Sequence, residues 1–288
     1  MSRVLRIATR ASPLARWQAE RVATLLGEAC EVVPVESMGD RLQDRPIHEL
    51  GGQGVFVKEV QAAVQRGEAD LAVHSAKDLP SGAAAEGLVL ACVPERADVR
   101  DCLVGATLDE LASGAVVATG SVRRRAQLAA LRPDLAFSEL RGNMATRLAK
   151  VPNGGAVVAA AAALQRLGSA DRISQLLEPD VLLPQVAQGA LAVECRADDL
   201  DALERLAGIE DPSARRRVDA ERAFLARLGG GCDLPVGALA TDLGAGRLRL
   251  EGLLADPAPH RVVAEGQDPT SLGLAVAEAL LAGPSSPP

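Results

Sequence analysis

The chain has 288 residues, of which 48% are apolar and 24% charged, and its net charge at pH 7 is −7. This length predicts two or three domains, and the apolar share is sufficient for their cores. The acidic balance argues against a general role on nucleic acids or membrane surfaces. With no Tyr, three Phe and one Trp, the cores must be built from aliphatic side chains.

The N-terminus and the cysteines favour a cytoplasmic protein. The opening residues, MSRVLRIATRAS, reach charge too early for a signal peptide, and the longest apolar run, 156–164, is too short to cross a bilayer. The five cysteines are odd in number, widely spaced and free of CxxC pairs, which argues against a disulfide framework and a zinc site. We therefore expect no metal, no membrane and no nucleic acid among its partners.

The first ninety residues alternate between short strands and amphipathic helices. Ser12 followed by Pro13 predicts a helix start, because Ser is a favoured N-cap and Pro a favoured first helical residue. The expected elements are strands at 5–9, 31–37 and 70–75, and helices at 13–26 and 56–67. Such alternation is typical of a parallel sheet with crossover helices.

The pattern restarts near residue 115. IATRASPLARWQ and VATGSVRRRAQL each contain a strand end, Thr, small residues, Ser and a helix start, which indicates two similar α/β domains, although chance could produce the same likeness. The later expected elements are a strand at 115–119, a helix at 122–132, a loop opening a helix within 140–151, an alanine-rich strand, a helix at 218–228, alternating stretches at 248–255 and 261–266, and a last helix near 272–281. Two stretches with proline, 94–100 and 209–216, are expected to be connections.

Arginine is concentrated in one segment. Six arginines but only two acids lie in 121–147. Arg123 and Arg124 fall in the first turn of the expected helix, where cations oppose the helix dipole, so a bound anion would offset the cost. Arg10 and Ser12 repeat this arrangement in the first half. Two such sites would suit a substrate with several carboxylates, or a phosphate, whereas the rest of the cluster could be a solvated helix face.

Three other stretches could carry chemistry. SAKDLP places Lys77 and Asp78 at the end of an expected parallel strand, where open α/β sheets hold ligands, although Asp there is also a common N-cap or turn former. The glycine-rich stretch 51–56 is either a lid or an ordinary loop and is not a P-loop. GGGCDLPVG displays Cys232 as a reactive thiolate, an attachment point or a plain exposed thiol. The other four cysteines are expected to be small buried hydrophobes.

Together these blocks resemble the porphobilinogen deaminase (hydroxymethylbilane synthase) family over nearly the whole chain. The matching blocks, in the family's order, are LRIATRASPLARWQA, GGQGVFVKE, DLAVHSAKDLP, VATGSVRRRAQL, LRGNMATRLAK, LPQVAQGALAVECR and ERAFLARLGGGCDLPVG. HSAKDLP, LRGNMATRLAK and GGGCDLPVG are specific on their own. The resemblance implies a transferase of haem biosynthesis that joins four porphobilinogen molecules into the linear tetrapyrrole hydroxymethylbilane and releases ammonia each time.

The resemblance also implies roles for individual residues. Asp78 would be the catalytic carboxylate, and Cys232 would carry a dipyrromethane cofactor through a thioether. The residues implied to bind the cofactor are Ser75, Lys77, Thr119, Ser121, Arg123 and Arg124, and those implied to bind substrate are Arg10, Ser12, Gln53, Arg141, Arg147 and Arg166. This sequence departs from the family at Gln53, where many members carry Lys, at Gly120, where Ser is common, and in the shortened stretch 153–160.

The family fold implies two α/β domains like those of periplasmic binding proteins, followed by a small α+β C-terminal domain, in a monomer. The expected boundaries are 1–94 with 189–208, then 99–184, then 212–288. Two other functions compete. A non-enzymatic anion-binding protein of the periplasmic type gives Cys232 no role and would need an export signal. Nucleic-acid binding through the RRR run would need a broader basic surface and stacking aromatics.

Overall fold

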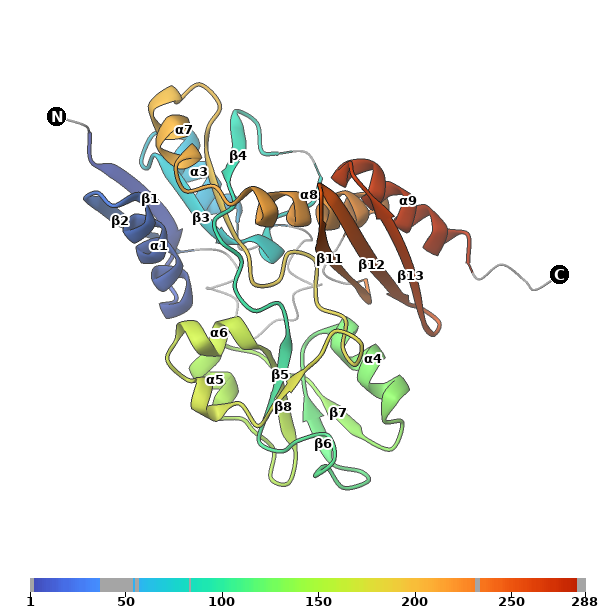
Figure 1. The fold of residues 1–288 in the computed structure, drawn as a ribbon. Helices are drawn as coiled ribbons and strands as arrows, with labels where there is room; N and C mark the ends of the chain where they lie inside the picture. The colour runs from blue at the N-terminus through green and yellow to red at the C-terminus, as the bar shows by residue number, and fades with distance from the viewer. Residues whose placement is uncertain (1–2, 37–53, 55–56, 83, 231–233, 284–288) are drawn as a thin grey trace. The chain divides into compact units, whose positions relative to one another are not determined.

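The computed structural model describes residues 3–36, 54, 57–82, 84–230 and 234–283. Its contacts divide the chain into two compact units, which are Met1–Ala97 with Gly189–Arg215 and Asp98–Gln188 with Arg216–Pro288 (Figure 1). In the parts that are described, no helix is long and apolar enough to cross a membrane.

The first unit is built on a five-stranded mixed sheet. Its elements are β1 (Leu5–Arg10), α1 (Pro13–Leu26), β2 (Cys30–Val35), α3 (Lys58–Gln65), β3 (Leu71–Ser75), the 3-10 helix η2 (Ala76–Asp78), β4 (Leu88–Cys92), β10 (Leu191–Arg196) and α7 (Leu200–Ala207). The strand order is β2-β1-β3-β10-β4, in which β1 is parallel to β2 and β3, while β10 is antiparallel to β3 and β4. The parallel pair β1 and β3 therefore ends at one edge of the sheet.

Helix α1 begins where the sequence predicts. Ser12 is its N-cap and accepts a hydrogen bond from the Ala15 amide at 3.3 Å, and Pro13 is its first residue. The helix ends at Gly27, whose φ of 69° lies in the left-handed region that glycine adopts without strain. Its buried face is formed by Ala15, Gln18, Ala19 and Val22. The spacing of these residues is that of one helix face, and Gln18 is the polar member among them.

Helices cover both faces of this sheet. Ile7 belongs to one apolar cluster, which includes Val22 of α1 and Leu206 of α7. The next residue of β1, Ala8, belongs to a second cluster with Val60 of α3. Neighbouring residues of a strand point to opposite faces, so β1 contributes to both cores.

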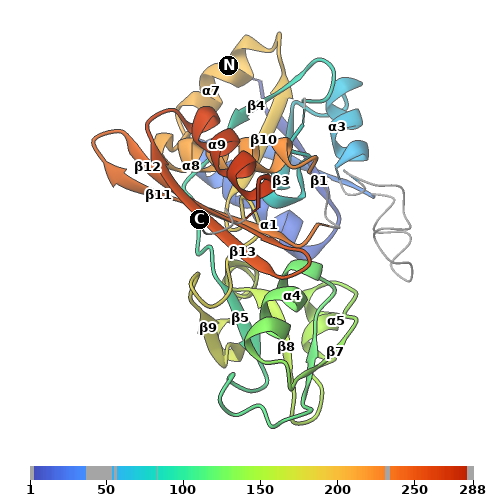
Figure 2. The same ribbon diagram turned by 90° about the vertical axis from the view of Figure 1, so that its right-hand side faces the viewer.

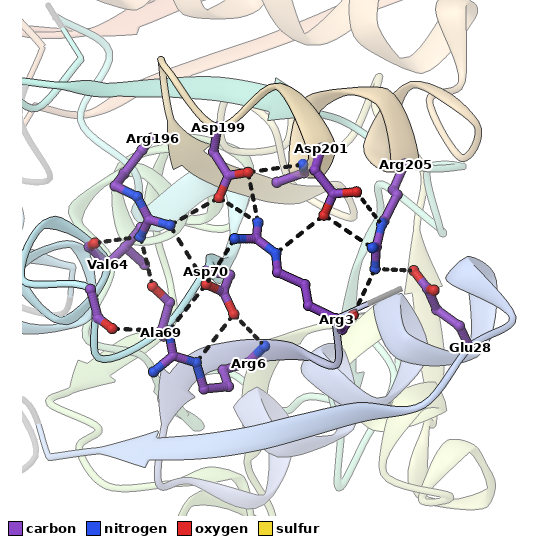
Figure 3. Close-up of polar contacts among 12 residues, drawn as sticks. Arg3, Arg6, Glu28, Val64, Ala69, Asp70, Arg196, Asp199, Asp201 and Arg205 are labelled. Atoms are coloured by element: carbon purple, nitrogen blue, oxygen red, sulfur yellow. Dashed lines mark hydrogen bonds and ion pairs between the residues drawn. The ribbon is translucent and has the colours of Figure 1, made fainter. Parts of the chain in front are cut away.

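Ion pairs join the opposite edge of the sheet to the returning chain (Figure 3). Asp70, which precedes β3, accepts hydrogen bonds from the Arg6 amide at 2.9 Å and from Arg6 Nε and Nη2 at 3.2 and 3.1 Å. Asp199, the N-cap of α7, binds Arg3 at 2.6 Å and Arg196 at 2.9 Å. Arg196 also lies 3.5 Å from Asp70, so the network ties β1, β3 and β10 together.

We expect Asp70→Asn to destabilise the protein by about 1–3 kcal/mol at neutral pH, because three hydrogen bonds from Arg6 would lose their charged acceptor. Burial raises the pKa of Asp70, but the hydrogen bonds from Arg6 and the charges of Arg6 and Arg3 outweigh it and lower the pKa. The carboxylate therefore stabilises the fold fully above its unfolded pKa of about 3.9, and this contribution is lost as pH falls through the lower folded pKa.

Urea unfolding between pH 7 and pH 3 measures this effect. The wild type should approach the stability of Asp70→Asn as the pH falls, and the exposed Asp171→Asn should match the wild type throughout. A stability difference that stays constant over this pH range would contradict the assignment.

The second unit repeats the sheet of the first. Its elements are β5 (Asp101–Val104), β6 (Val116–Ala118), α4 (Val122–Leu131), β7 (Ala136–Ser138), α5 (Met144–Leu148), β8 (Ala156–Ala160), α6 (Ala161–Arg166), η3 (Ala170–Arg172) and β9 (Gln175–Leu177). The order β7-β6-β8-β5-β9 matches β2-β1-β3-β10-β4 in strand position and direction. In each sheet the fourth strand in this order, β10 or β5, runs antiparallel to both its neighbours and is the first strand formed after the chain enters or re-enters that unit.

The last part of the second unit is a three-stranded antiparallel sheet with two helices. Its elements are α8 (Pro212–Arg227, which begins in the first unit), β11 (Val236–Gly244), β12 (Arg247–Ala255), β13 (Pro259–Gly266) and α9 (Pro269–Leu281). Both helices lie against β12 (Figure 2), because a Cβ at Gly252 would lie 2.6 Å from Phe224 of α8 and 2.7 Å from Val276 of α9. The predicted fold class, two α/β domains and a small α+β domain, is confirmed.

Of the expectations about the apolar segments, one is confirmed and one needs correction. The alanine-rich strand is β8, and the rest of the apolar run 156–164 belongs to α6, which follows β8 immediately. Among the cysteines expected to be buried, Cys92, Cys102 and Cys195 are fully buried, but Cys30 is only partly so. Cys30 begins β2, an edge strand with a neighbour on one side only.

The predicted connection 209–216 is also too long. Helix α8 begins at Pro212, and the Asp211 side chain accepts a hydrogen bond from the Ala214 amide at 2.8 Å. Asp211 and Pro212 thus repeat the arrangement of cap and first-turn proline seen at Ser12 and Pro13. The Asp-Pro pair was the signal for this helix start.

Candidate functional site

A small cavity lies at the carboxyl ends of β1 and β3. Its volume is about 60 Å³, and the residues that line it include Arg10, Ser12, Ser75 and Asp78. The roughly 10–15 Å³ that a water molecule needs is well below this volume, so small polar groups can enter. The structure thus brings together four of the predicted site residues within one unit.

The cavity is shaped by a glutamine that the sequence analysis did not single out. Gln18 Nε2 donates to Ser75 Oγ at 2.7 Å, and Gln18 itself is 2% exposed. Thr9 Oγ1, also buried, donates to the Val73 carbonyl at 3.2 Å and holds β1 to β3. A polar residue on an otherwise apolar helix face must find a partner, and this was the available signal for Gln18.

Lys77 and Asp78 follow β3 directly in η2. The turn is closed by the Leu79 amide, which donates to the Ala76 carbonyl at 3.2 Å. Ala76 and Leu79 are buried, whereas Lys77 and Asp78 are partly exposed. The short helix therefore anchors its apolar residues in the core and presents the two charged ones at the edge of the sheet.

A buried polar group lies behind the cavity. His74, one of the lining residues, has its Nε2 3.1 Å from Glu194 Oε2, without the alignment of a hydrogen bond. Gln61 Nε2 donates to both oxygens of the same carboxylate, at 3.0 and 2.8 Å. These three side chains come from β3, β10 and α3, and each is at most 8% exposed. They join the cavity wall to the interior of the unit.

In the second unit, Arg123 and Arg124 share one carboxylate. Asp101 of β5 accepts from Arg123 Nη2 at 2.7 Å and from Arg124 Nη2 and Nε at 2.7 and 3.1 Å. Gln188 Nε2 adds a further hydrogen bond to Asp101 at 2.9 Å. The anion that the sequence analysis sought for these two cations is therefore, in part, a side chain of the protein. Asp101 gave no sequence signal, because it lies on strand β5, 22 residues before Arg123 of helix α4.

The charges at this site do not cancel. Burial alone would raise the pKa of Asp101, but the adjacent charges of Arg123 and Arg124 hold it well below its usual range. Asp101 is thus an anion, and the three side chains together carry one net positive charge. Burial also lowers the pKa of Arg123, whose Nε is buried and has no hydrogen-bond partner among the described residues. One positive charge and an unused donor suit an anionic group.

The turn before α4 supplies hydroxyl groups. Ser121 is the N-cap of α4 and accepts from the Arg124 amide at 3.4 Å, and its own amide donates to Thr119 Oγ1 at 3.2 Å. At Gly120 a Cβ would lie 2.8 Å from the Leu140 carbonyl oxygen. A side chain at this position would have to displace that backbone oxygen, so the turn as built here requires glycine.

The remaining predicted arginines lie at two short helices of the second unit. Arg147 in α5 donates from Nε to the Gly142 carbonyl at 2.8 Å, and Arg141 is partly exposed just before this helix. Burial lowers the pKa of Arg166, in the last turn of α6, to about 10. Cys232 and Gln53 lie outside the described residues.

These features define an α/β protein with a carboxylate at the edge of one sheet and a buried arginine pair around Asp101 in the other unit. Comparisons with known proteins identify the family. The model described as "Porphobilinogen deaminase, dipyromethane cofactor binding domain" matches residues 5–204, and "Porphobilinogen deaminase, C-terminal domain" matches 215–282. The chain belongs to the porphobilinogen deaminase family. The predicted family, enzyme class and dipyrromethane cofactor are confirmed, which favours the enzyme over both alternatives.

Curated relatives agree with this assignment. Porphobilinogen deaminase from Roseiflexus sp. (strain RS-1) is 48% identical, covering 98% of this chain and 97% of the relative. The protein of that name from Acidothermus cellulolyticus is 50% identical over 88% of this chain and 80% of its own length. The one from Brevibacillus brevis is 43% identical over 96% and 94%. Among solved structures, a TRAP periplasmic solute binding protein from Desulfovibrio salexigens is 12% identical, with a TM-score of 0.41 over 74% of this chain and 72% of that chain.

Proposed function

We propose that this chain condenses four porphobilinogen molecules head to tail into hydroxymethylbilane, releasing ammonia at each addition, in tetrapyrrole biosynthesis. The observation that carries the proposal is the cavity that holds Asp78 beside Arg10 and Ser12 in a member of the porphobilinogen deaminase family. Each substrate brings a basic aminomethyl group, a pyrrole N–H and two carboxylates. In the cavity, Asp78 can accept hydrogen bonds from the aminomethyl group and the pyrrole N–H, and Arg10 and Ser12 can donate to the carboxylates.

Asp78 acts as the catalytic carboxylate. When ammonia leaves, positive charge develops on the pyrrole, and a fixed carboxylate that accepts a hydrogen bond from the pyrrole N–H stabilises that charge. The same group can carry a proton between the reacting atoms. Its place in η2 supports this role, because the buried neighbours Ala76 and Leu79 hold the turn while Asp78 stays accessible.

The arginines bind the acetate and propionate groups of the substrates. Guanidinium groups suit this task because they bind carboxylates through two parallel hydrogen bonds. Arg10 and Ser12 line the cavity of the first unit. The remaining arginines of the set lie in the second unit. The proposed set is Arg10, Ser12, Arg141, Arg147 and Arg166, with Gln53 as a neutral donor.

Cys232 holds the dipyrromethane through a thioether. When bound, this group supplies the pyrrole end to which substrates are added. One of its carboxylates is held by Arg123 and Arg124, where one net positive charge and an unused Nε donor support the assignment. The other residues proposed to contact it are Ser75, Lys77, Thr119 and Ser121.

The chain works as a cytoplasmic monomer of three domains. We place these domains at 1–94 with 189–208, at 99–184 and at 212–288. The two sheets of identical strand order and the separate three-stranded sheet support this division.

The proposal is tested by incubating the purified protein with porphobilinogen alone. Ammonia release and substrate consumption should be equal, and the product should be a linear tetrapyrrole that closes spontaneously to a uroporphyrinogen. Consumption of porphobilinogen without tetrapyrrole, or binding without consumption, would overturn the proposed reaction. A protein boiled before the incubation is the control for uncatalysed condensation.

A further inference from the structure

Arg123 is fastened by both branches of its guanidinium group. Nη2 binds Asp101, and Nη1 donates to the Leu183 carbonyl oxygen at 2.6 Å. Arg123 is 3% exposed, and its partner Leu183 is fully buried. The position of the guanidinium group therefore depends on where the backbone at Leu183 lies.

The Leu183 backbone is itself braced by α4. Its amide donates to Gln127 Oε1 at 2.8 Å, and its carbonyl accepts from Gln127 Nε2 at 3.1 Å. Gln127 stands one helical turn after Arg123, so the two side chains reach the same carbonyl oxygen from one face of the helix. Leu183, Arg123 and Gln127 thus form one rigid buried group.

The first residues of β11 also pack against Leu183 and the next residue, Pro184. The Ala238 amide donates to the Pro184 carbonyl oxygen at 3.0 Å. At Gly237 a Cβ would lie 2.9 Å from the carbonyl oxygens of both Leu183 and Pro184, and 3.4 Å from Arg123 Cδ. Glycine is therefore what permits β11 to approach this closely. Leu183 also packs with Leu239 of β11 in one apolar cluster.

A second strand of the small sheet, β13, also contacts this part of the chain. Arg261 of β13 donates from Nη1 to the Pro179 carbonyl at 3.1 Å and from Nη2 to Gln127 Oε1 at 3.3 Å. Arg261 also binds Glu251 of β12 at 2.9 Å. The small sheet is consequently held to the segment 179–184 by two of its strands.

Cys232 precedes Gly237 by five residues. Five residues span at most about 18 Å, so fixing Gly237 limits where the thiol can be. We propose that the Leu183–Pro184 segment is a positioning element that sets the strand following Cys232 against Arg123, so that a dipyrromethane tethered at the cysteine meets the arginine pair. This inference rests on the proposed function, because it takes Cys232 as the attachment point and Arg123 and Arg124 as its carboxylate partners.

The test uses Gly237→Val in the full chain, prepared as the apo-protein from cells that cannot make porphobilinogen. After porphobilinogen is added, denatured intact-mass spectrometry follows the rate at which the protein gains two pyrrole units. A displacement of about 1 Å in a reacting geometry can cost about 10²-fold, and we expect a loss of that order in the loading rate. Loading is read as mass and needs no turnover by the loaded enzyme.

Gly252→Ala is the matched control. It also forces a Cβ into contacts shorter than 3.0 Å within the same sheet, but against Phe224 and Val276 rather than against Leu183 and Pro184. It should lower the melting temperature and still load at the wild-type rate. If both variants load normally, or if both slow in proportion to their loss of stability, the positioning role is wrong.

Gln127→Met decides the question if Gly237→Val does not fold. It keeps the length of the side chain but removes the two hydrogen bonds that brace Leu183. Slower loading is expected, in the same direction and by a smaller factor, and loading at the wild-type rate would overturn the inference. If the wild type itself gains no pyrrole units, the proposed function fails. If the wild type loads, and Gly237→Val and Gln127→Met both load at the wild-type rate, only this inference fails.

Discussion

Asp78→Asn should remove nearly all turnover and leave the fold intact. Asn has the same shape as Asp but cannot carry the negative charge that stabilises the cationic pyrrole, nor accept and return a proton. Losses of about 10²–10⁴-fold in kcat are typical when such a group is neutralised. Because Arg10 and Ser12 remain in the cavity, KM for porphobilinogen should change far less than kcat.

Single-turnover and steady-state assays of tetrapyrrole formation measure this effect, with circular dichroism and the melting temperature as checks of the fold. The control is Asp198→Asn, an exposed carboxylate of the same unit that lies outside the cavity. It should match the wild type. A kcat for Asp78→Asn near the wild-type value, in a correctly folded protein, would remove Asp78 from the mechanism.

The elements that the sequence predicted well carry local signals. Helix α1 has both its cap and its first-turn proline in sequence, and β1 and β3 are short apolar runs next to turn residues. Strand β10 has no such local signal for its place, because it pairs antiparallel with β3, more than a hundred residues earlier. Its position in the first sheet depends on tertiary pairing, and only the family resemblance indicated a return of the chain near 189.

The arginine segment shows where sequence reasoning about a site reaches its limit. Composition alone revealed a cluster of cations, but their partners are set by the fold. Arg125 is exposed, with its guanidinium group 5.9 Å from the centre of the Phe137 ring, as expected for a solvated helix face. Arg132 instead binds Asp134 and the carbonyls of Leu108 and Leu111. Arginines of one helix therefore take part in a buried ion pair, lie in solvent and close the helix end.

Asp101 also changes the net charge of the site from the value that the sequence suggests. Counted from the sequence, Arg123 and Arg124 offer two positive charges to a ligand. Counted in the structure, they offer one, because the buried Asp101 neutralises the other. A single remaining charge matches one carboxylate at this place. Under the proposed function, the further carboxylates of a growing chain need other cations, and we propose Arg147 of α5 and Arg166 of α6 for them.

Cys232→Ser should abolish both the attached group and the activity. The serine hydroxyl is a far weaker nucleophile than a thiolate, so the corresponding ether to the pyrrole should not form. Intact-mass spectrometry of the denatured wild type, purified from cells that make porphobilinogen, should show two pyrrole units on the chain, and the variant should have the unmodified mass. The buried Cys102→Ser, whose thiol has its pKa raised to about 12 by burial, should keep the adduct and serves as the control.

The mass of the purified chain and the fate of an isotopic label together separate the possible roles of this thiol. If Cys232 attacks each substrate in turn, the purified wild type should carry no stable group and should show a mass of the bare chain. If it is a tether, the adduct should survive many turnovers unchanged, and the pyrrole units bound to it should not be exchanged for labelled ones during catalysis. Label from isotopic porphobilinogen should then appear in the product and not in the two retained units, and its appearance in those units would contradict a permanent tether.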